Sequence, residues 1–121
     1  MAPINVLVTG GVGYISSHAC RAFKIAGYTP ICVDNLSTGW ADAVKFGPFK
    51  NVDLLDQSKL ANVFKKYQPI AVMHFAALSQ VGESVKNPEK YWRNNVVGSL
   101  NLFQACVTHR CDNVIFSSTC A

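Results

Sequence analysis

Short apolar runs alternate along this 121-residue chain with longer segments of helical periodicity. The first run, INVLVT at residues 4–9, is almost continuously apolar, which is typical of a strand buried on both faces of a sheet. Similar runs recur after each helical segment. The pattern predicts five strands, at residues 4–9, 30–33, 49–52, 70–75 and 113–116.

Three helices are predicted between these strands, because apolar residues recur there every three or four positions. We expect the recurring side chains to face the core. They are Ile15, Ala19, Ala22, Phe23 and Ala26 in the first helix, Leu60, Val63, Phe64 and Tyr67 in the second, and Val96, Leu100, Phe103 and Val107 in the third.

The ends of these helices carry recognisable capping residues. Gly27 is placed to end the first helix, since glycine readily adopts the left-handed conformation found there. The second helix has two candidate N-caps, Asp56 and Ser58. Asn87 followed by Pro88 predicts the start of the third helix, with a capping side chain and a proline at the first helical position.

Strands that alternate with helices favour an α/β fold, a parallel sheet with right-handed crossovers and helices on both faces. The length suits a single domain, which we assign to residues 1–121. Ligands of such sheets bind outside the carboxyl ends of the strands. Each predicted strand is followed there by small or polar residues, namely Gly10-Gly11, Asp34-Asn35, Asp53, Ala76-Ala77 and Ser117-Ser118-Thr119.

The strongest local motif is the glycine-rich turn that joins the first strand to the first helix. Gly10, Gly11 and Gly13 let the backbone turn tightly and approach a pyrophosphate, which the helix N-terminus attracts. Ser16 stands where a third glycine of a dinucleotide-binding turn would fall. A glycine-rich turn without a ligand is the alternative, but the strand–turn–helix context favours nucleotide binding.

Asp34 ends the second strand, 21 residues after Gly13. A carboxylate at this place accepts hydrogen bonds from both ribose hydroxyls of an adenosine and repels a 2′-phosphate, which favours NAD over NADP. An ordinary turn aspartate is the alternative. Asp53, after the third strand, is a candidate for the adenine edge or for capping a turn.

Other polar residues carry weaker signals. His74 lies inside an apolar strand, and we interpret it as a hydrogen-bonded core histidine rather than a ligand or base. The hydroxyls of 117–119 are either a polar strand end or donors to a reacting alcohol.

Composition narrows the classes of function. Half of the residues are hydrophobic, 15% are charged and the net charge is +4, with scattered charges that favour neither nucleic acid nor a membrane as partner. The five cysteines form no Cys-x-x-Cys pair, so we expect reduced thiols, a cytoplasmic location and no metal site. The glycines break the first apolar stretch, so neither a membrane span nor a signal peptide is expected.

Taken together, several segments resemble the N-terminal part of the UDP-glucose 4-epimerases, a family of extended short-chain dehydrogenases/reductases. They follow family order and cover nearly the whole chain. The segments are VTGGVGYISSH (8–18), VDNLSTG (33–39), HFAALSQVGESV (74–85), NP (87–88), NNVVGS (94–99) and FSSTCA (116–121). The resemblance implies a Rossmann-like doubly wound sheet, NAD as cofactor and a UDP-sugar as substrate.

The resemblance also implies roles for individual residues, matched by motif. The pyrophosphate would contact Gly10, Gly13, Tyr14 and Ile15, the ribose would contact Asp34 and Asn35, and Asp53 and Leu54 would flank adenine. Phe75, Ala76 and Ala77 would line the cofactor, Asn94 would lie near the substrate, and Thr119 would be the catalytic hydroxyl that binds the sugar 4-hydroxyl.

The chain departs from the family pattern at three points. Ser16 replaces a glycine of close helix–strand contact, and we expect tolerance with weaker cofactor binding. Ser79 stands where some members carry a cofactor-contacting lysine. None of the four tyrosines is followed by a lysine four positions later, so the Tyr-x-x-x-Lys pair is absent.

Without that pair we expect a partial NAD-binding domain that does not catalyse epimerisation by itself. The alternative is a stand-alone nucleotide-binding or interaction module without enzyme activity. Either way, a sheet cut after its fifth strand exposes apolar surface, from which we expect a homo-oligomer formed through the exposed edge.

Overall fold

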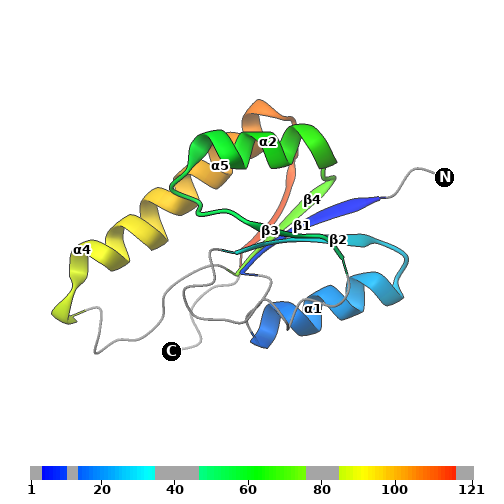
Figure 1. Ribbon diagram of the computed structural model, residues 1–121, viewed down its shortest axis with the longest axis horizontal. Coiled ribbons are helices and arrows are strands. Elements are labelled where there is room, and N and C mark those ends of the chain that lie inside the picture. Colours follow the sequence, from blue (N-terminus) through cyan, green and yellow to red (C-terminus); the bar gives the residue numbers. More distant parts are fainter. Residues whose placement is uncertain (1–3, 11–13, 35–46, 76–84, 117–121) are drawn as a thin grey trace.

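The computed structural model describes residues 4–10, 14–34, 47–75 and 85–116. Five parallel strands form one twisted sheet in the order β3-β2-β1-β4-β5 (Figure 1). The strands are β1 (Asn5–Thr9), β2 (Thr29–Asp34), β3 (Phe49–Asn51), β4 (Ala71–His74) and β5 (Asn113–Phe116). The predicted α/β fold with a parallel five-stranded sheet is confirmed.

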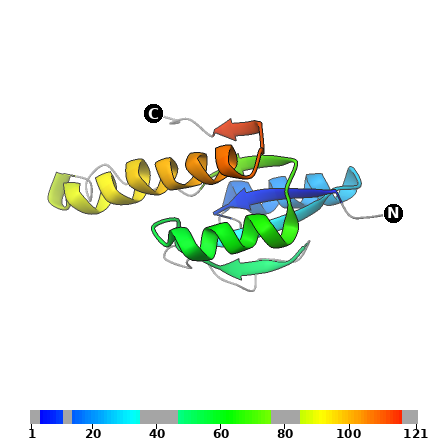
Figure 2. The same ribbon diagram turned by 90° about the horizontal axis from the view of Figure 1, so that it is seen from above.

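Helices cover both faces of this sheet. Helix α1 (Tyr14–Ile25) lies on one face, and α2 (Gln57–Tyr67) lies with α5 (Gly98–Thr108) on the other, as the two views show (Figures 1 and 2). The strand order reverses at β1, which has β2 on one side and β4 on the other. This reversal is the place where open parallel sheets bind their ligands.

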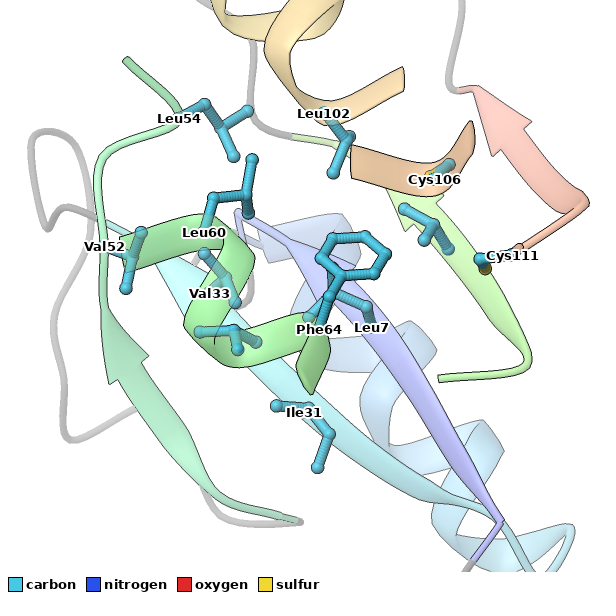
Figure 3. Close-up of a cluster of buried hydrophobic side chains, with 12 residues drawn as sticks. Leu7, Ile31, Val33, Val52, Leu54, Leu60, Phe64, Leu102, Cys106 and Cys111 are labelled. Atoms are coloured by element: carbon cyan, nitrogen blue, oxygen red, sulfur yellow. The ribbon is translucent and has the colours of Figure 1, made fainter. Parts of the chain in front are cut away.

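Two apolar clusters fill the spaces between the layers. Leu7 of β1 belongs to the larger cluster, under α2 and α5 (Figure 3), while Val6 and Val8 belong to the smaller cluster, under α1. Neighbouring residues of a strand point to opposite faces, so both faces of β1 are buried. The continuous apolar run in the sequence has this physical origin.

The helix caps resolve the alternatives left by the sequence. The Asp56 carboxylate accepts a hydrogen bond from the Lys59 backbone N–H at 3.2 Å, so Asp56 rather than Ser58 is the N-cap of α2. Gly27 has a φ of 95° and donates its backbone N–H to the Lys24 carbonyl at 3.1 Å, as predicted for the end of α1.

The third predicted helix is divided into three segments. Asn87 caps α4 (Pro88–Tyr91), as expected, and a π-helical segment, η2 (Trp92–Val97), connects it to α5. A π-helix has wider turns than an α-helix and therefore rotates the residues that follow it relative to an α-helical count.

The predicted core stripe of this helix is wrong in α5. Leu100, Phe103 and Val107 are exposed. The side that packs on the protein consists of Gly98, Ser99, Leu102 and Cys106. Small residues allow close approach here, since a Cβ at position 98 would lie 3.3 Å from the Leu54 Cβ.

The stripe predicted for α1 also needs correction. Ala22 and Ala26 are exposed, whereas Ser16 and Cys20 are buried and Phe23 is partly buried. Small residues again form the buried side of the helix, where it lies against β1 and β2. The stripe predicted for α2 is correct, with Leu60, Val63 and Phe64 buried.

Candidate functional site

The turn after β1 is attached directly to the neighbouring strand. Gly10 has a φ of 72°, a left-handed conformation that favours glycine, and its N–H donates to the Val33 carbonyl of β2 at 2.7 Å. Helix α1 begins at Tyr14. The end of β1, the start of α1 and the end of β2 therefore meet at the carboxyl edge of the sheet.

Ser16 is accommodated within this turn. Its side chain is buried, with 1% of its surface exposed, and its hydroxyl donates a hydrogen bond to the Gly10 carbonyl. The buried hydroxyl thus has a hydrogen-bond partner within the protein, as buried polar groups usually do. It also ties the first turn of α1 to the residue that leaves β1.

Asp34 lies beside the same turn. It is the last residue of β2, half-buried, and directly follows Val33, the partner of Gly10. Its backbone carbonyl accepts a hydrogen bond from Val52 at 3.1 Å, which fixes the strand end against β3. The structure therefore brings Asp34 and Gly10, the first glycine of the motif, to neighbouring strand ends.

Asp53 and Leu54 follow β3 at the same edge. The Asp53 carboxylate accepts a hydrogen bond from the Leu55 N–H at 3.0 Å, which is the turn-capping role that the sequence left open. Leu54 is 8% exposed and belongs to the larger core cluster. Its carbonyl accepts a hydrogen bond from the Asn101 side chain of α5 at 2.9 Å.

A buried polar chain joins β1, β4 and α5 beneath the edge. His74 lies 2.7 Å from the Thr9 hydroxyl through Nδ1 and 2.7 Å from the Ser99 hydroxyl through Nε2. The Phe75 N–H donates to the Thr9 hydroxyl at 3.0 Å, which positions the backbone just after β4. Burial lowers the pKa of His74 to about 4, so the ring is neutral.

The interpretation of His74 as a hydrogen-bonded core histidine is therefore confirmed. Its partner Ser99 was missed, because the two residues are 25 positions apart and a serine inside a helical pattern carries no signal of a distant contact.

The remaining predicted site residues divide into those outside the described ranges and those within them. Gly13, Asn35, Ala76, Ala77 and Thr119 lie outside the described residues, as does Ser79. Tyr14 and Ile15 are described as members of α1, and Asn94 as a member of η2. Phe75 is partly buried and packs on the smaller core cluster.

A pocket of about 700 Å³ lies at the opposite edge of the sheet. Its lining includes Gln68, Pro69 and Ile70 before β4, and Arg110 and Asp112 before β5. These residues precede their strands, so the pocket is remote from the turn at Gly10 and contains none of the predicted site residues.

Within the described ranges, no helix has the length and apolar character needed to cross a membrane.

Comparison with known proteins agrees with this geometry. Residues 6–121 match the model of the NAD dependent epimerase/dehydratase family. The chain is 45% identical over 117 residues to UDP-glucose 4-epimerase of Rhizobium meliloti (strain 1021), which covers 97% of this chain and 36% of that protein. It is 38% identical over 129 residues to UDP-glucose 4-epimerase of Homo sapiens, covering 95% of this chain and 37% of the relative.

Solved structures give the same result. UDP-glucose 4-epimerase from Brucella ovis in complex with NAD superposes with a TM-score of 0.94 at 52% identity, covering 97% of this chain and 36% of that one. The enzyme from Thermotoga maritima with UDP-glucose gives 0.93 at 35% identity, covering 96% of this chain and 38% of that one. The chain thus spans little more than a third of these relatives and corresponds to their N-terminal portion. By the extent of these matches, it belongs to the NAD dependent epimerase/dehydratase family.

Proposed function

We propose that this chain is the NAD-binding portion of a protein of the UDP-glucose 4-epimerase type. The observation that carries the proposal is the bond from the Gly10 N–H to the Val33 carbonyl, next to Asp34, at the strand where the sheet order reverses. The Brucella ovis relative contains NAD, and its structure is similar over 97% of this chain.

The described residues fit a dinucleotide. The left-handed backbone at Gly10 leaves no side chain between β1 and a pyrophosphate, and α1 is long enough to present a positive N-terminal end. In our proposal Gly10, Gly13, Tyr14 and Ile15 hold the pyrophosphate.

The remaining cofactor contacts follow the carboxyl edge of the sheet. Asp34 and Asn35 bind the adenosine ribose, while Asp53 and Leu54 flank adenine through their backbone and turn. Phe75, Ala76 and Ala77 line the cofactor beyond β4, where the hydrogen bond from Phe75 to Thr9 fixes the chain.

The substrate side of the site is proposed to need further polypeptide. Bound NAD would supply the oxidant for the sugar 4-carbon, Thr119 would hydrogen-bond the sugar 4-hydroxyl, and Asn94 would lie on the substrate side. A threonine hydroxyl is too weakly basic at neutral pH to replace a tyrosinate base. We therefore propose that these 121 residues bind NAD in the cytoplasm without epimerising a UDP-sugar.

Calorimetric titration of the chain with NAD tests this function. We expect saturable binding that Asp34→Asn weakens about tenfold, because a charge-assisted hydrogen bond to the ribose is lost while the size of the side chain is kept. Asp112→Asn is the matched control, since Asp112 is exposed and lies at the opposite edge of the sheet.

Absence of binding at millimolar NAD, or equal affinity of both variants, would contradict the proposal. A coupled assay with UDP-galactose completes the test. Turnover by the 121 residues that Thr119→Val abolishes would show that the chain is an active enzyme after all.

A second candidate function, self-association, is favoured by the exposure of β5. Its apolar residues Val114, Ile115 and Phe116 are 37%, 58% and 53% exposed, and β4 is its only partner among the described strands. An apolar strand edge of this kind pairs readily with another chain. We propose that a second copy of this chain covers β5.

A further inference from the structure

Two thiols lie against each other between α1 and β2. The Sγ atoms of Cys20 and Cys32 are 3.2 Å apart, and the two side chains are 2% and 1% exposed. They are free thiols in contact, contributed by different elements and separated by 12 residues in the sequence. Neither thiol has a part in the function proposed above.

The contact is close to what a disulfide requires. An S–S bond is about 2.05 Å long, so the sulfur atoms would have to approach by about 1.2 Å. The two elements already pack on each other, since both side chains belong to the cluster under α1. A displacement of this size is within the reach of small side-chain and helix adjustments.

The two thiols are not equivalent. The hydrogen bond with Cys32 lowers the pKa of Cys20, whereas the hydrogen bond with Cys20, burial and the negative charge of Asp34 raise the pKa of Cys32. On the other face of the sheet, burial raises the pKa of Cys106 to about 12 and also raises that of Cys111. Among the four described cysteines, Cys20 is the one whose pKa is lowered, and the thiolate is the reactive form.

The two cysteines lie near two parts of the candidate site, the Ser16–Gly10 hydrogen bond and Asp34. Cys20 is one helical turn after Ser16 on the same side of α1, and the Ser16 hydroxyl holds the Gly10 carbonyl. Cys32 is two residues before Asp34 and shares its face of β2. A covalent bond between the thiols would draw α1 toward β2 and shift the glycine turn relative to Asp34.

We propose that Cys20 and Cys32 form an oxidisable dithiol that peroxide converts to a disulfide. The Cys20 thiolate attacks one oxygen of hydrogen peroxide, the O–O bond breaks, and the departing hydroxide takes up a proton as water. The Cys32 thiol then attacks the resulting Cys20 sulfenic sulfur, forms the S–S bond and releases a second water. Two thiols are oxidised and one peroxide is reduced.

The oxidant reaches this site through local opening of α1, because both sulfur atoms are buried. The reaction is therefore slower than that of an exposed thiol and depends on how often the helix separates from the sheet.

Peptide mapping after peroxide treatment tests the proposal on the full chain. The Cys120→Ser background removes the cysteine outside the described residues. We expect a cross-linked pair of peptides that contain Cys20 and Cys32, reversed by dithiothreitol. Cys20→Ser and Cys32→Ser should each abolish this cross-link, and the control Cys106→Ser should behave as the background.

Alkylation of both Cys20 and Cys32 after peroxide treatment, with no cross-linked peptide, would overturn the proposal. So would a cross-link that forms between Cys106 and Cys111 in preference to this pair.

The effect on the site is measured separately and rests on the proposed NAD binding. We expect the oxidised chain to bind NAD at least about fivefold more weakly than the reduced chain, with recovery after reduction and no change in peroxide-treated Cys32→Ser. Equal affinities would show that the disulfide and the nucleotide site are uncoupled. If reduced protein fails to bind NAD, the proposed function fails, while the mapping still decides the disulfide.

Discussion

His74 shows how one buried side chain makes the stability of the fold depend on pH. The pKa of the ring falls from 6.5 to about 4 because burial disfavours the charged form. Below pH 6.5 the His74 ring is therefore protonated in the unfolded chain, whereas in the folded chain it stays neutral down to about pH 4. The free energy of unfolding should be full above pH 6.5 and fall by about 3 kcal/mol as the pH drops to about 4.

Chemical denaturation across this pH range tests the prediction. The variant His74→Gln should lower the free energy of unfolding at neutral pH and flatten its dependence on pH below 6.5. NMR titration of the ring gives a direct reading that does not need a variant. A midpoint near 6.5 for His74 would contradict the buried network.

At the scale of single elements, the start of α2 offers a clean test of capping. Asp56→Ala removes the acceptor for the Lys59 N–H and should cost about 1 kcal/mol in the free energy of unfolding. Ser58→Ala is the matched control two residues further on, exposed and in the first turn of the helix, and should be neutral or slightly stabilising. A loss for Ser58→Ala in urea denaturation, with none for Asp56→Ala, would contradict the assignment of Asp56 as the cap.

The elements also show what could be predicted from the sequence. The strands were predictable because a strand buried on both faces needs apolar residues at successive positions. Val6, Leu7 and Val8 of β1 are an example, since all three are buried. The buried sides of α1 and α5 were not, because Ser16, Gly98 and Ser99 give no apolar signal while exposed Leu100 and Val107 do. The π-helical segment η2 was not predicted, because its wider hydrogen-bonding pattern leaves no recognisable residue pattern in this sequence.

The candidate site also contains features that the sequence predicts and contacts that it does not. Gly10 and Asp34 were predictable, since their positions follow from where β1 and β2 end. The bond between Ser16 and the Gly10 carbonyl, and the contact of Cys20 with Cys32, depend on how closely α1 approaches the sheet. That distance is set by packing among distant residues, which periodicity does not encode.

At the scale of the whole molecule, the exposed apolar surface leads to a prediction about assembly. In sedimentation velocity the 121-residue chain should form dimers or larger species as concentration rises. Ile115→Lys should shift it toward monomer, because a charge on an edge strand opposes pairing. Ile25→Lys is the matched control, since Ile25 is 76% exposed on α1, away from β5.

A single monomeric boundary at all concentrations would contradict self-association. If Leu100→Glu but not Ile115→Lys gives monomers, the contact lies on α5 rather than on β5.

The division of α5 into a small-residue side and an aliphatic side has a practical meaning for anyone who wants this domain as a free-standing scaffold. Leu100 and Val107 are 61% and 74% exposed, while Leu102 and Cys106 make the contacts that hold the helix in place. Charged replacements at the first two positions would raise solubility and leave the interior unchanged. The exposed side chains of α5 can thus be substituted without changing the residues that pack beneath the helix.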